Sequence, residues 1–303
     1  MKYAIVIDSS CGLTQEQAHK LGWHFLPLHI NIEGKEYKDG VDITPENLFN
    51  FYNKNSKAKT SAVNLGYAEE LFSKLSKDYD RIIVYPISKH LSASCASLTT
   101  LAKDFEKVRV VNSIQVLQMI LIDLVWFEHQ MSIDSSRLDE YIDILEKDNL
   151  WHRKSISLIP KFNSYLVKGG RLHPAAAAVA KLLKIVPIIC WKDGQLLKEA
   201  VGRTFSKTVL KAIDLKKEIL PIEKGKELYV MSLDSHSDIA ERDDLLNNIF
   251  EKFGIHSIHG LIAPVVGIHT GPEALAILVY EMEPAVAQKC REFFKNLGYI
   301  SKQ

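Results

Sequence analysis

One recurring pattern limits the possible folds of this chain: an apolar strand, then a short turn rich in hydroxyl groups, then a helix. It is clearest from Arg81 to Lys103, where the apolar run Ile82–Tyr85 is closed by Pro86. Apolar residues recur at helical spacing from Leu98 onward. The turn between them carries Ser88, Ser92, Ser94 and Ser97. The segment therefore predicts a strand, a hydroxyl-rich loop and a helix, in that order.

Similar turns occur three more times in the first half of the chain. They are Asp8–Ser10 after the apolar run Tyr3–Ile7, Asn112-Ser113 after Arg109–Val111, and Thr60-Ser61 before a helix over Tyr67–Ser76. Strands that alternate with helices predict a mostly parallel, Rossmann-like sheet flanked by helices. Because ligands of such sheets lie beyond the carboxyl ends of the strands, we expect the hydroxyl groups to gather along one edge.

Two interpretations of Ser92 follow from this position. Serine is a common N-cap, so Ser92 is expected to cap the helix that follows it. The first turn of a helix also has unpaired N–H groups and a partial positive charge, so serines there can help to bind an anion. The convergence of four hydroxyl-bearing turns on one edge favours a binding site for an anionic ligand.

The second half of the chain indicates an α+β domain with a mixed or antiparallel sheet and helices on one side. Asp193-Gly194, between two apolar strands, is typical of a tight hairpin. We place the domains at residues 1–154 and 155–303. Three further expectations are a single strand over Phe25–Ile32, an alanine-rich helix from Pro174 to about Leu183, and an apolar run over Ser257–Ile268 that ends in a turn at His269.

The composition is that of an ordinary soluble protein. The 303 residues, 47% hydrophobic and 25% charged, suffice for two domains with a large core. A net charge of +1 gives no reason to expect a nucleic-acid partner. The N-terminal MKYAIVIDSS lacks the core of a signal peptide, and the longest apolar stretch, Met119–Phe127, is shorter than the about 20 residues that a bilayer requires. Four scattered cysteines without metal-ligand spacing indicate reduced thiols: Cys11, Cys95, Cys190 and Cys290. We expect a cytoplasmic protein without a cofactor or a metal.

Three side chains in the second half are candidates for ligand contacts. Arg171 follows Gly169-Gly170, where the backbone can approach an anion closely, although a helix C-cap with a nearby cation has the same sequence. His269 ends an apolar run and is expected at the mouth of a buried sheet, in a structural or a functional role. Arg203 and Lys207 share one helical face, as a cationic patch or an ordinary solvated surface.

The sequence excludes several kinds of catalytic site. It has no G-x-S-x-G elbow, no P-loop and no G-x-G-x-x-G after a strand. His256 and His259 have no third ligand at zinc spacing. One catalytic alternative stays open, a hydrolase or transferase that acts on acyl or phosphoryl groups through Ser92 and His269. Asp8 or Asp234 would then orient the histidine.

Short motifs along nearly the whole chain, in order, resemble the DegV family, the bacterial fatty-acid-binding proteins that present a bound fatty acid to a fatty acid kinase. They are Asp8-Ser9-Ser10, Val41-Asp42-Ile43-Thr44, Lys59-Thr60-Ser61, Ile87-Ser88 with Leu91-Ser92, Val111 with Ser113, Lys168-Gly169-Gly170-Arg171-Leu172, Leu183-Lys184-Ile185-Val186-Pro187, Pro264-Val265-Val266 and His269-Thr270-Gly271.

The resemblance implies two domains with an apolar tunnel between them and a non-catalytic role in lipid binding. The ligand carboxylate would be bound by Thr60, Ser92, Arg171 and His269. Arg203 would lie near the mouth that faces the kinase or a membrane surface. Other residues implied near the carboxylate or the mouth are Ser61, Ser94, Asn112, Ser113, Thr270 and Gly271. The implied partners are a long-chain fatty acid, a separate kinase and, transiently, a membrane surface.

The chain departs from the family pattern at four positions. Ala62, Ala93, Asn112 and Glu273 replace the residues that are usual there. Ala93 replaces a glycine between two hydroxyl residues, which restricts the backbone where it approaches the carboxylate. Alanine still adopts helical and extended conformations, so binding is compatible with the change. These departures bear on kinase docking and on ligand preference.

Overall fold

The structure is a computed structural model that describes residues 1–147, 150–151, 153–173, 175–176, 178 and 185–301. The chain forms two compact units, and each is described by itself. Unit 1 comprises Met1–Leu150 and Ala263–Val266, and unit 2 comprises Trp151–Ile262 and Gly267–Gln303. The division falls four residues before the expected boundary, and the first unit also takes a short segment from late in the chain.

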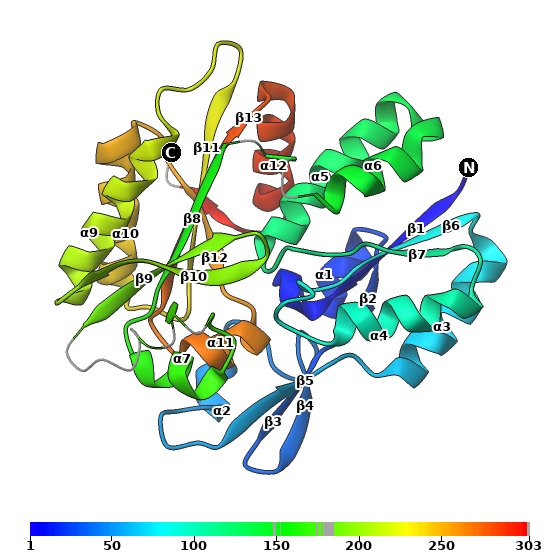
Figure 1. Ribbon diagram of the computed structural model, residues 1–303, viewed down its shortest axis with the longest axis horizontal. Helices are drawn as coiled ribbons and strands as arrows, with labels where there is room; N and C mark the ends of the chain where they lie inside the picture. The colour runs from blue at the N-terminus through cyan, green and yellow to red at the C-terminus, as the bar shows by residue number, and fades with distance from the viewer. Residues whose placement is uncertain (148–149, 152, 174, 177, 179–184, 302–303) are drawn as a thin grey trace. The chain divides into compact units, whose positions relative to one another are not determined.

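Unit 1 is built on the expected parallel sheet. Its order is β2-β1-β6-β7, and each neighbouring pair is parallel. The strands are β1 (Tyr3–Asp8), β2 (His24–Leu26), β6 (Arg81–Tyr85) and β7 (Val108–Val110). The ribbon shows α3 and α4 on one face of this sheet and α5 on the other (Figure 1). The helices of unit 1 are α1 (Gln15–Lys20), α2 (Leu48–Phe51), α3 (Leu65–Asp78), α4 (Ser94–Leu101), α5 (Gln118–Ile133) and α6 (Leu138–Leu145).

A second, three-stranded sheet in unit 1 has the order β4-β3-β5. Its strands are β3 (His29–Ile32), β4 (Lys35–Lys38) and β5 (Ala58–Ser61). The prediction of one strand over Phe25–Ile32 is therefore wrong. Pro27 lies between β2 and β3 and cannot donate to a strand ladder, so the chain leaves one sheet there and enters the other.

Unit 2 contains a seven-stranded mixed sheet, which confirms the predicted class. Its order is β10-β9-β8-β13-β11-β12-β14, and only β11 and β12 pair in parallel among the described neighbours. The strands are β8 (Lys154–Ile159), β9 (Val186–Lys192), β10 (Gln195–Gly202), β11 (Glu227–Asp234), β12 (Ile258–Leu261), β13 (Leu275–Met282) and β14 (Ile300–Ser301). The predicted hairpin joins β9 to β10, and its central residues Asp193 and Gly194 have φ angles of 50° and 76°. Two positive φ values are typical of the tight turns that match strand twist.

Helices cover both faces of the central strands of this sheet, so the expectation of helices on one side is wrong. The main core of unit 2 packs Ile277 and Val279 of β13 with residues of α9 (Phe205–Leu215) and α10 (Ile239–Phe253). On the opposite face, Arg291 of α12 (Pro284–Asn296) lies over the ring of Tyr229. Figure 1 shows α9 and α10 on one side of β13 and α12 on the other. Every residue of β13 is buried, as such a strand requires.

Two short helices carry predicted site residues. Helix α7 (Asn163–Gly169) of unit 2 precedes Arg171. Helix α11 (Pro264–Thr270) contains His269; its first three residues are assigned to unit 1 and the rest, with His269, to unit 2. The apolar run after Ser257 is thus a short strand followed by a helix, not an extended segment that ends in a turn. Proline at the first helical position favours this start, and periodicity alone cannot separate a buried strand from a buried helix. Much of the predicted helix from Pro174 to Leu183 lies outside the described residues; Ala175, Ala176 and Ala178 are helical.

Four short 3₁₀ turns complete the described elements: η1 (Ser9–Cys11), η2 (Ala102–Asp104), η3 (Ser135–Arg137) and η4 (Lys216–Ile219). Within the described ranges, no helix has the length and apolar character needed to cross a bilayer. All four cysteines are free thiols.

Candidate functional site

The polar turns that follow β1, β6 and β7 lie together at one edge of the parallel sheet. The Ile87 N–H donates to Asp8 Oδ2 at 2.6 Å. The Ser88 N–H donates to the Gln115 carbonyl at 2.7 Å, and the Lys89 N–H donates to the Ser113 carbonyl at 2.9 Å. The expected gathering is therefore present for these three turns. Thr60-Ser61, expected as a fourth turn at the same edge, instead lies in strand β5 of the three-stranded sheet, so that part of the prediction is wrong.

Most hydroxyl groups at this edge are buried and bind the protein itself. Ser9 donates to Asp39 at 2.8 Å, and Ser10 donates to Asp8 at 2.5 Å. The Ser113 oxygen accepts from the Gln115 N–H at 3.2 Å, and the side chain of Ser113 is fully buried. These serines hold the loops together, so the structural interpretation fits them better than ligand contact. Asn112, in the same turn, is exposed.

Ser92 differs because its hydroxyl group is only partly buried. Its oxygen accepts from the Ser94 N–H at 3.2 Å and lies 3.0 Å from the Ser94 hydroxyl oxygen. Helix α4 begins at Ser94, so Ser92 supports the helix start from one residue before the N-cap position, which Ala93 occupies. If the buried Ser94 hydroxyl donates to Ser92, the Ser92 proton can be donated to a ligand. Capping and binding are therefore compatible in this residue.

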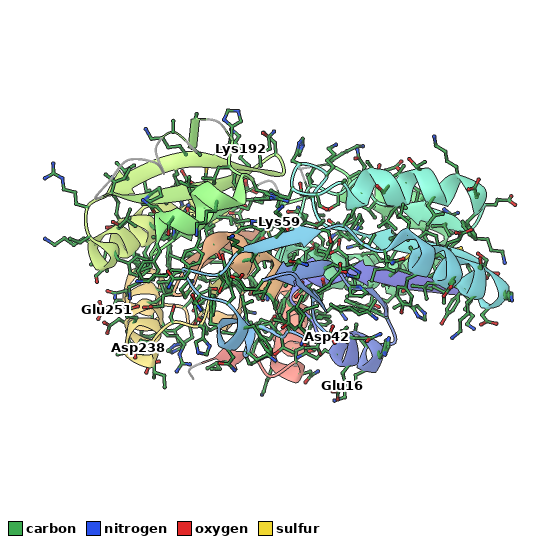
Figure 2. The ribbon with its side chains drawn as sticks, turned by 90° about the horizontal axis from the view of Figure 1, so that it is seen from below. Glu16, Asp42, Lys59, Lys192, Asp238 and Glu251 are labelled. Carbon is green, nitrogen blue, oxygen red and sulfur yellow. The ribbon has the colours of Figure 1, made fainter. Side chains whose placement is uncertain are left out.

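Thr60 and Ser61 lie on opposite faces of β5. Thr60 is paired with Ile30, which is fully buried, whereas Ser61 is paired with His29. Successive side chains of a strand point to opposite faces, so Thr60 shares the apolar face of the three-stranded sheet. Ser61 is exposed, as is Lys59, which precedes Thr60 in the sequence and is labelled in Figure 2. Of the two hydroxyl residues, Thr60 is the better placed for contact with an apolar ligand.

A hydrogen bond connects the segment after β5 to the loop of Ser92. The Val63 N–H donates to Ser94 Oγ at 3.3 Å. Thr60 lies three residues before this donor, and Ser92 lies two residues before the acceptor. The two predicted carboxylate ligands of unit 1 therefore come from segments in direct contact, although they belong to different sheets.

In unit 2, Arg171 lies beside the C-terminus of α7. Gly170 ends the helix in the left-handed conformation, with φ of 66°. Arg171 Nη1 donates to the Gly169 carbonyl at 2.6 Å. The C-cap interpretation is thus correct for this segment. One bond to a carbonyl uses only part of the guanidinium group, which has five N–H donors.

The imidazole of His269 lies against the backbone of Gly169. A Cβ atom at residue 169 would come within 2.7 Å of His269 Nδ1, so only glycine allows this approach. Burial, and secondly the positive charge of Arg171, lower the pKa of His269 to about 4. The structure therefore brings Arg171 and His269 together, with a cationic guanidinium group beside a neutral imidazole at pH 7.

Tight packing also fixes the residues next to His269. Gly271 has φ of 79°, and a Cβ there would lie 2.5 Å from the ring of Tyr165. Thr270 is buried. Arg203 is exposed just before α9, and the preceding Gly202 lies against Thr208. Gly271 and Thr270 are thus parts of the packing around His269, while Arg203 lies on the surface.

Glu273, one of the four departures from the family pattern, adopts a conformation that favours glycine. Its φ is 57°. Its carboxylate pairs with Lys161, which also pairs with Glu241 at 2.7 Å. The ion pair offsets part of the cost of a left-handed conformation with a side chain.

Sequence reasoning missed a buried polar cluster in unit 2. Ser232 Oγ lies 2.9 Å from His259 Nδ1, and Asp234 Oδ2 lies 2.8 Å from His259 Nε2. Ser232 and His259 are direct neighbours on β11 and β12, so strand pairing brings them together. All three side chains are buried, which excludes a substrate from this set. The i, i+2 spacing of Ser232 and Asp234 was a usable signal, but their partner strand was not predictable locally.

No cluster of three or more potential metal-ligating His, Cys, Asp or Glu side chains occurs in the described part of the chain. The catalytic alternative also loses its orienting carboxylates. Asp8 binds Ser10 and the Ile87 N–H, and Asp234 binds His259 rather than His269.

The family model described as "Uncharacterised protein, DegV family" matches residues 2–282. A DegV domain-containing protein of Mycoplasmopsis pulmonis is 37% identical over 295 residues, which covers 97% of this chain and 100% of the relative. A DegV domain-containing protein of Clostridium acetobutylicum is 26% identical over 92% of this chain and 99% of its own length.

Solved structures share the fold. A DegV family protein from Thermus thermophilus, described with fatty acid binding, gives a TM-score of 0.79 at 20% identity, with 93% of this chain and 100% of that chain covered. DegV of Bacillus subtilis, described as a fatty acid binding protein, gives 0.79 at 20% identity over 93% and 99%. A stearic acid-binding protein from Eubacterium ventriosum gives 0.78 at 23% identity over 92% and 98%.

Proposed function

This chain is a member of the DegV family, and we propose that it binds a long-chain fatty acid and presents the carboxylate to a separate fatty acid kinase. The protein itself is proposed to be non-catalytic. Three structural relatives are described as binding fatty acids, which supports the ligand class. The Val63–Ser94 hydrogen bond, which holds the segment of Thr60 against the loop of Ser92, carries the proposal for the head group.

The proposed head-group contacts come from Thr60, Ser92, Arg171 and His269. Hydroxyl and guanidinium donors form charge-assisted hydrogen bonds with a carboxylate. A neutral His269 adds an N–H donor without a second positive charge. In this proposal, the polar groups orient the ligand.

The acyl tail supplies most of the affinity. Burial of each methylene contributes about 0.8 kcal/mol, so a chain of roughly 16 carbons gives on the order of 10 kcal/mol before the cost of association. We propose that the tail occupies an apolar tunnel of the protein. Exchange of the ligand at a membrane surface is part of the same proposal.

Native mass spectrometry of the purified protein tests the ligand. We expect an adduct with the mass of a fatty acid, lost after delipidation and restored by hexadecanoic acid. Absence of any adduct after incubation with fatty acids of different lengths would contradict the proposal. A panel of esterase and phosphatase substrates tests the catalytic alternative, because turnover that Ser92→Ala abolishes would favour an enzyme.

The kinase step needs a separate measurement. The loaded protein, a candidate fatty acid kinase and ATP are incubated with hydroxylamine, which traps acyl phosphate as a hydroxamate. We expect hydroxamate only when both proteins are present. Formation by this protein and ATP alone would show that catalysis resides in this chain.

A further inference from the structure

The turn after β1 connects four neighbouring segments of unit 1. The carboxylate of Asp8 accepts from the Ile87 N–H at 2.6 Å, in the loop after β6. The Ser9 hydroxyl donates to Asp39 and accepts from the Leu28 N–H at 3.0 Å. The Ser10 carbonyl accepts from the Leu117 N–H at 2.9 Å. All these polar groups are directed into the protein, so this turn contacts the loops rather than a ligand.

A short series of hydrogen bonds connects Asp8 to the backbone of Ser92 through Ile87 and Ser88. Ile87 is followed by Ser88, whose carbonyl accepts from the N–H groups of Leu91 at 2.9 Å and Ser92 at 3.3 Å. The position of Ile87 and Ser88 therefore sets the position of the Ser92 backbone. Asp8 provides the side-chain bond at the start of this path.

We infer that Asp8 is a positioning residue, which fixes the loop Ile87–Ser94 so that the Ser92 hydroxyl meets the ligand carboxylate. This inference rests on the proposed function. In this inference Asp8 itself does not touch the ligand, because its side chain is buried and its two oxygens accept from Ser10 and Ile87.

The energetics of Asp8 support a role other than stability. Burial raises the pKa of Asp8 to about 6, although the bonds from Ser10 and Ile87 favour the charged form. Burial also raises the pKa of a second buried carboxyl group, Asp39, well above its usual value, and the charge of Asp8 raises it further. Asp8 is therefore ionised at neutral pH at a cost in folding free energy, which is common for residues at functional sites.

Asp8→Asn tests the inference, because the amide has nearly the same shape but only one acceptor oxygen. Ser10→Ala is the matched control, since it removes a donor to the same carboxylate and leaves the Ile87 bond in place. The measured quantity is the ratio of Kd values for hexadecan-1-ol and hexadecanoic acid, which share a tail and differ in the head group. We expect Asp8→Asn to weaken acid binding about tenfold with alcohol binding unchanged. Ser10→Ala is expected to keep the wild-type ratio.

A second readout does not depend on any ligand. Amide hydrogen exchange of residues 87–94 is expected to be faster in Asp8→Asn than in the wild type and in Ser10→Ala. If Asp8→Asn does not fold, Asp8→Glu gives the same comparison, because it keeps the charge but moves the acceptor by one methylene.

The outcomes separate the two proposals. A wild-type ratio in folded Asp8→Asn, equal losses for acid and alcohol, or unchanged exchange of residues 87–94 would each overturn the positioning role alone. A wild-type protein that binds hexadecanoic acid no better than the alcohol would instead refute the proposed function, and the inference with it.

Discussion

Val63 and Ser94 are joined by a hydrogen bond of 3.3 Å between the N–H of one and the hydroxyl oxygen of the other. Val63 follows a strand of the three-stranded sheet, and Ser94 begins the helix after a strand of the parallel sheet. Thr60 lies three residues before Val63, and Ser92 lies two residues before Ser94. The bond therefore holds together two segments with hydroxyl residues that follow strands of different sheets.

Ser94→Ala removes the acceptor of the Val63 N–H and the neighbour of the Ser92 hydroxyl. We expect a loss of about 1 kcal/mol in the free energy of unfolding and weaker binding of hexadecanoic acid. Urea titration and a Kd measurement check this. Ser97→Ala, on the same helix, serves as the control and is expected to change neither quantity appreciably.

Thr60→Val keeps the shape of the side chain but removes its hydroxyl group. Since a hydrogen bond to a charged group contributes about 1.5–3 kcal/mol, we expect binding of hexadecanoic acid to weaken tenfold or more. Ser61→Ala, on the opposite face of β5, is expected to keep Kd within about twofold. Equal effects of the two substitutions would contradict the assignment of faces.

Glu273→Gly and Glu273→Ala separate backbone strain from the ion pair with Lys161. Both remove the pair, but only glycine relieves the left-handed conformation at φ 57°. We therefore expect the glycine variant to be more stable than the alanine variant by about 1 kcal/mol. Chemical denaturation of both proteins measures this difference, and equal stability would mean that residue 273 is not strained.

The raised pKa of Asp8 predicts that the stability of the folded protein falls as the pH rises. Its pKa is about 6 in the folded protein, above the reference value of 3.8, so the folded state holds the proton more tightly. Protonation of Asp8 therefore stabilises the folded protein. This contribution is fully present below pH 3.8 and is lost as the pH rises through 6. Asparagine does not titrate, so the free energy of unfolding of Asp8→Asn relative to wild type should rise by about 2.4 kcal/mol between pH 4 and 7. Urea titrations across this range check it, and a constant difference would refute it.

His259→Ala tests the buried cluster of Ser232, His259 and Asp234. The substitution leaves two buried polar groups without their shared partner, so we expect a loss of about 3 kcal/mol in the free energy of unfolding. His256→Ala is the control, because His256 is exposed and stacks on Phe250. Under conditions in which they are folded, both variants are expected to bind hexadecanoic acid with the same Kd as the wild type.

The architecture was largely predictable because its signals are local. Alternation of strands and helices predicted the parallel sheet, and Asp193-Gly194 predicted the hairpin through backbone preferences alone. The turns after β1, β6 and β7 were expected at one edge because parallel strands share a direction. The errors occurred where local signals are ambiguous, at Pro27 between two sheets and at Pro264, where an apolar run becomes a helix.

The roles of the hydroxyl groups were less predictable. Sequence alone grouped Ser10, Ser92 and Ser113, yet two of them are buried and bind the protein while Ser92 is partly exposed. Asp8 was expected in the polar turn after Tyr3–Ile7 and, in the catalytic alternative, as an orienting carboxylate for a histidine. It lies in that turn but binds the loop after β6. Such contacts join residues far apart in the chain, which short patterns cannot specify.

By itself, the sequence determined the alternation of strands and helices around the parallel sheet, the hairpin and the edge at which three polar turns collect, because these follow from backbone preferences over a few residues. Only the tertiary structure decided that Thr60 rather than Ser61 shares a face with Ile30, and that Gly169 lies against His269. The physical reason is that side-chain direction and burial depend on strand register and long-range packing, which are fixed only when distant segments meet.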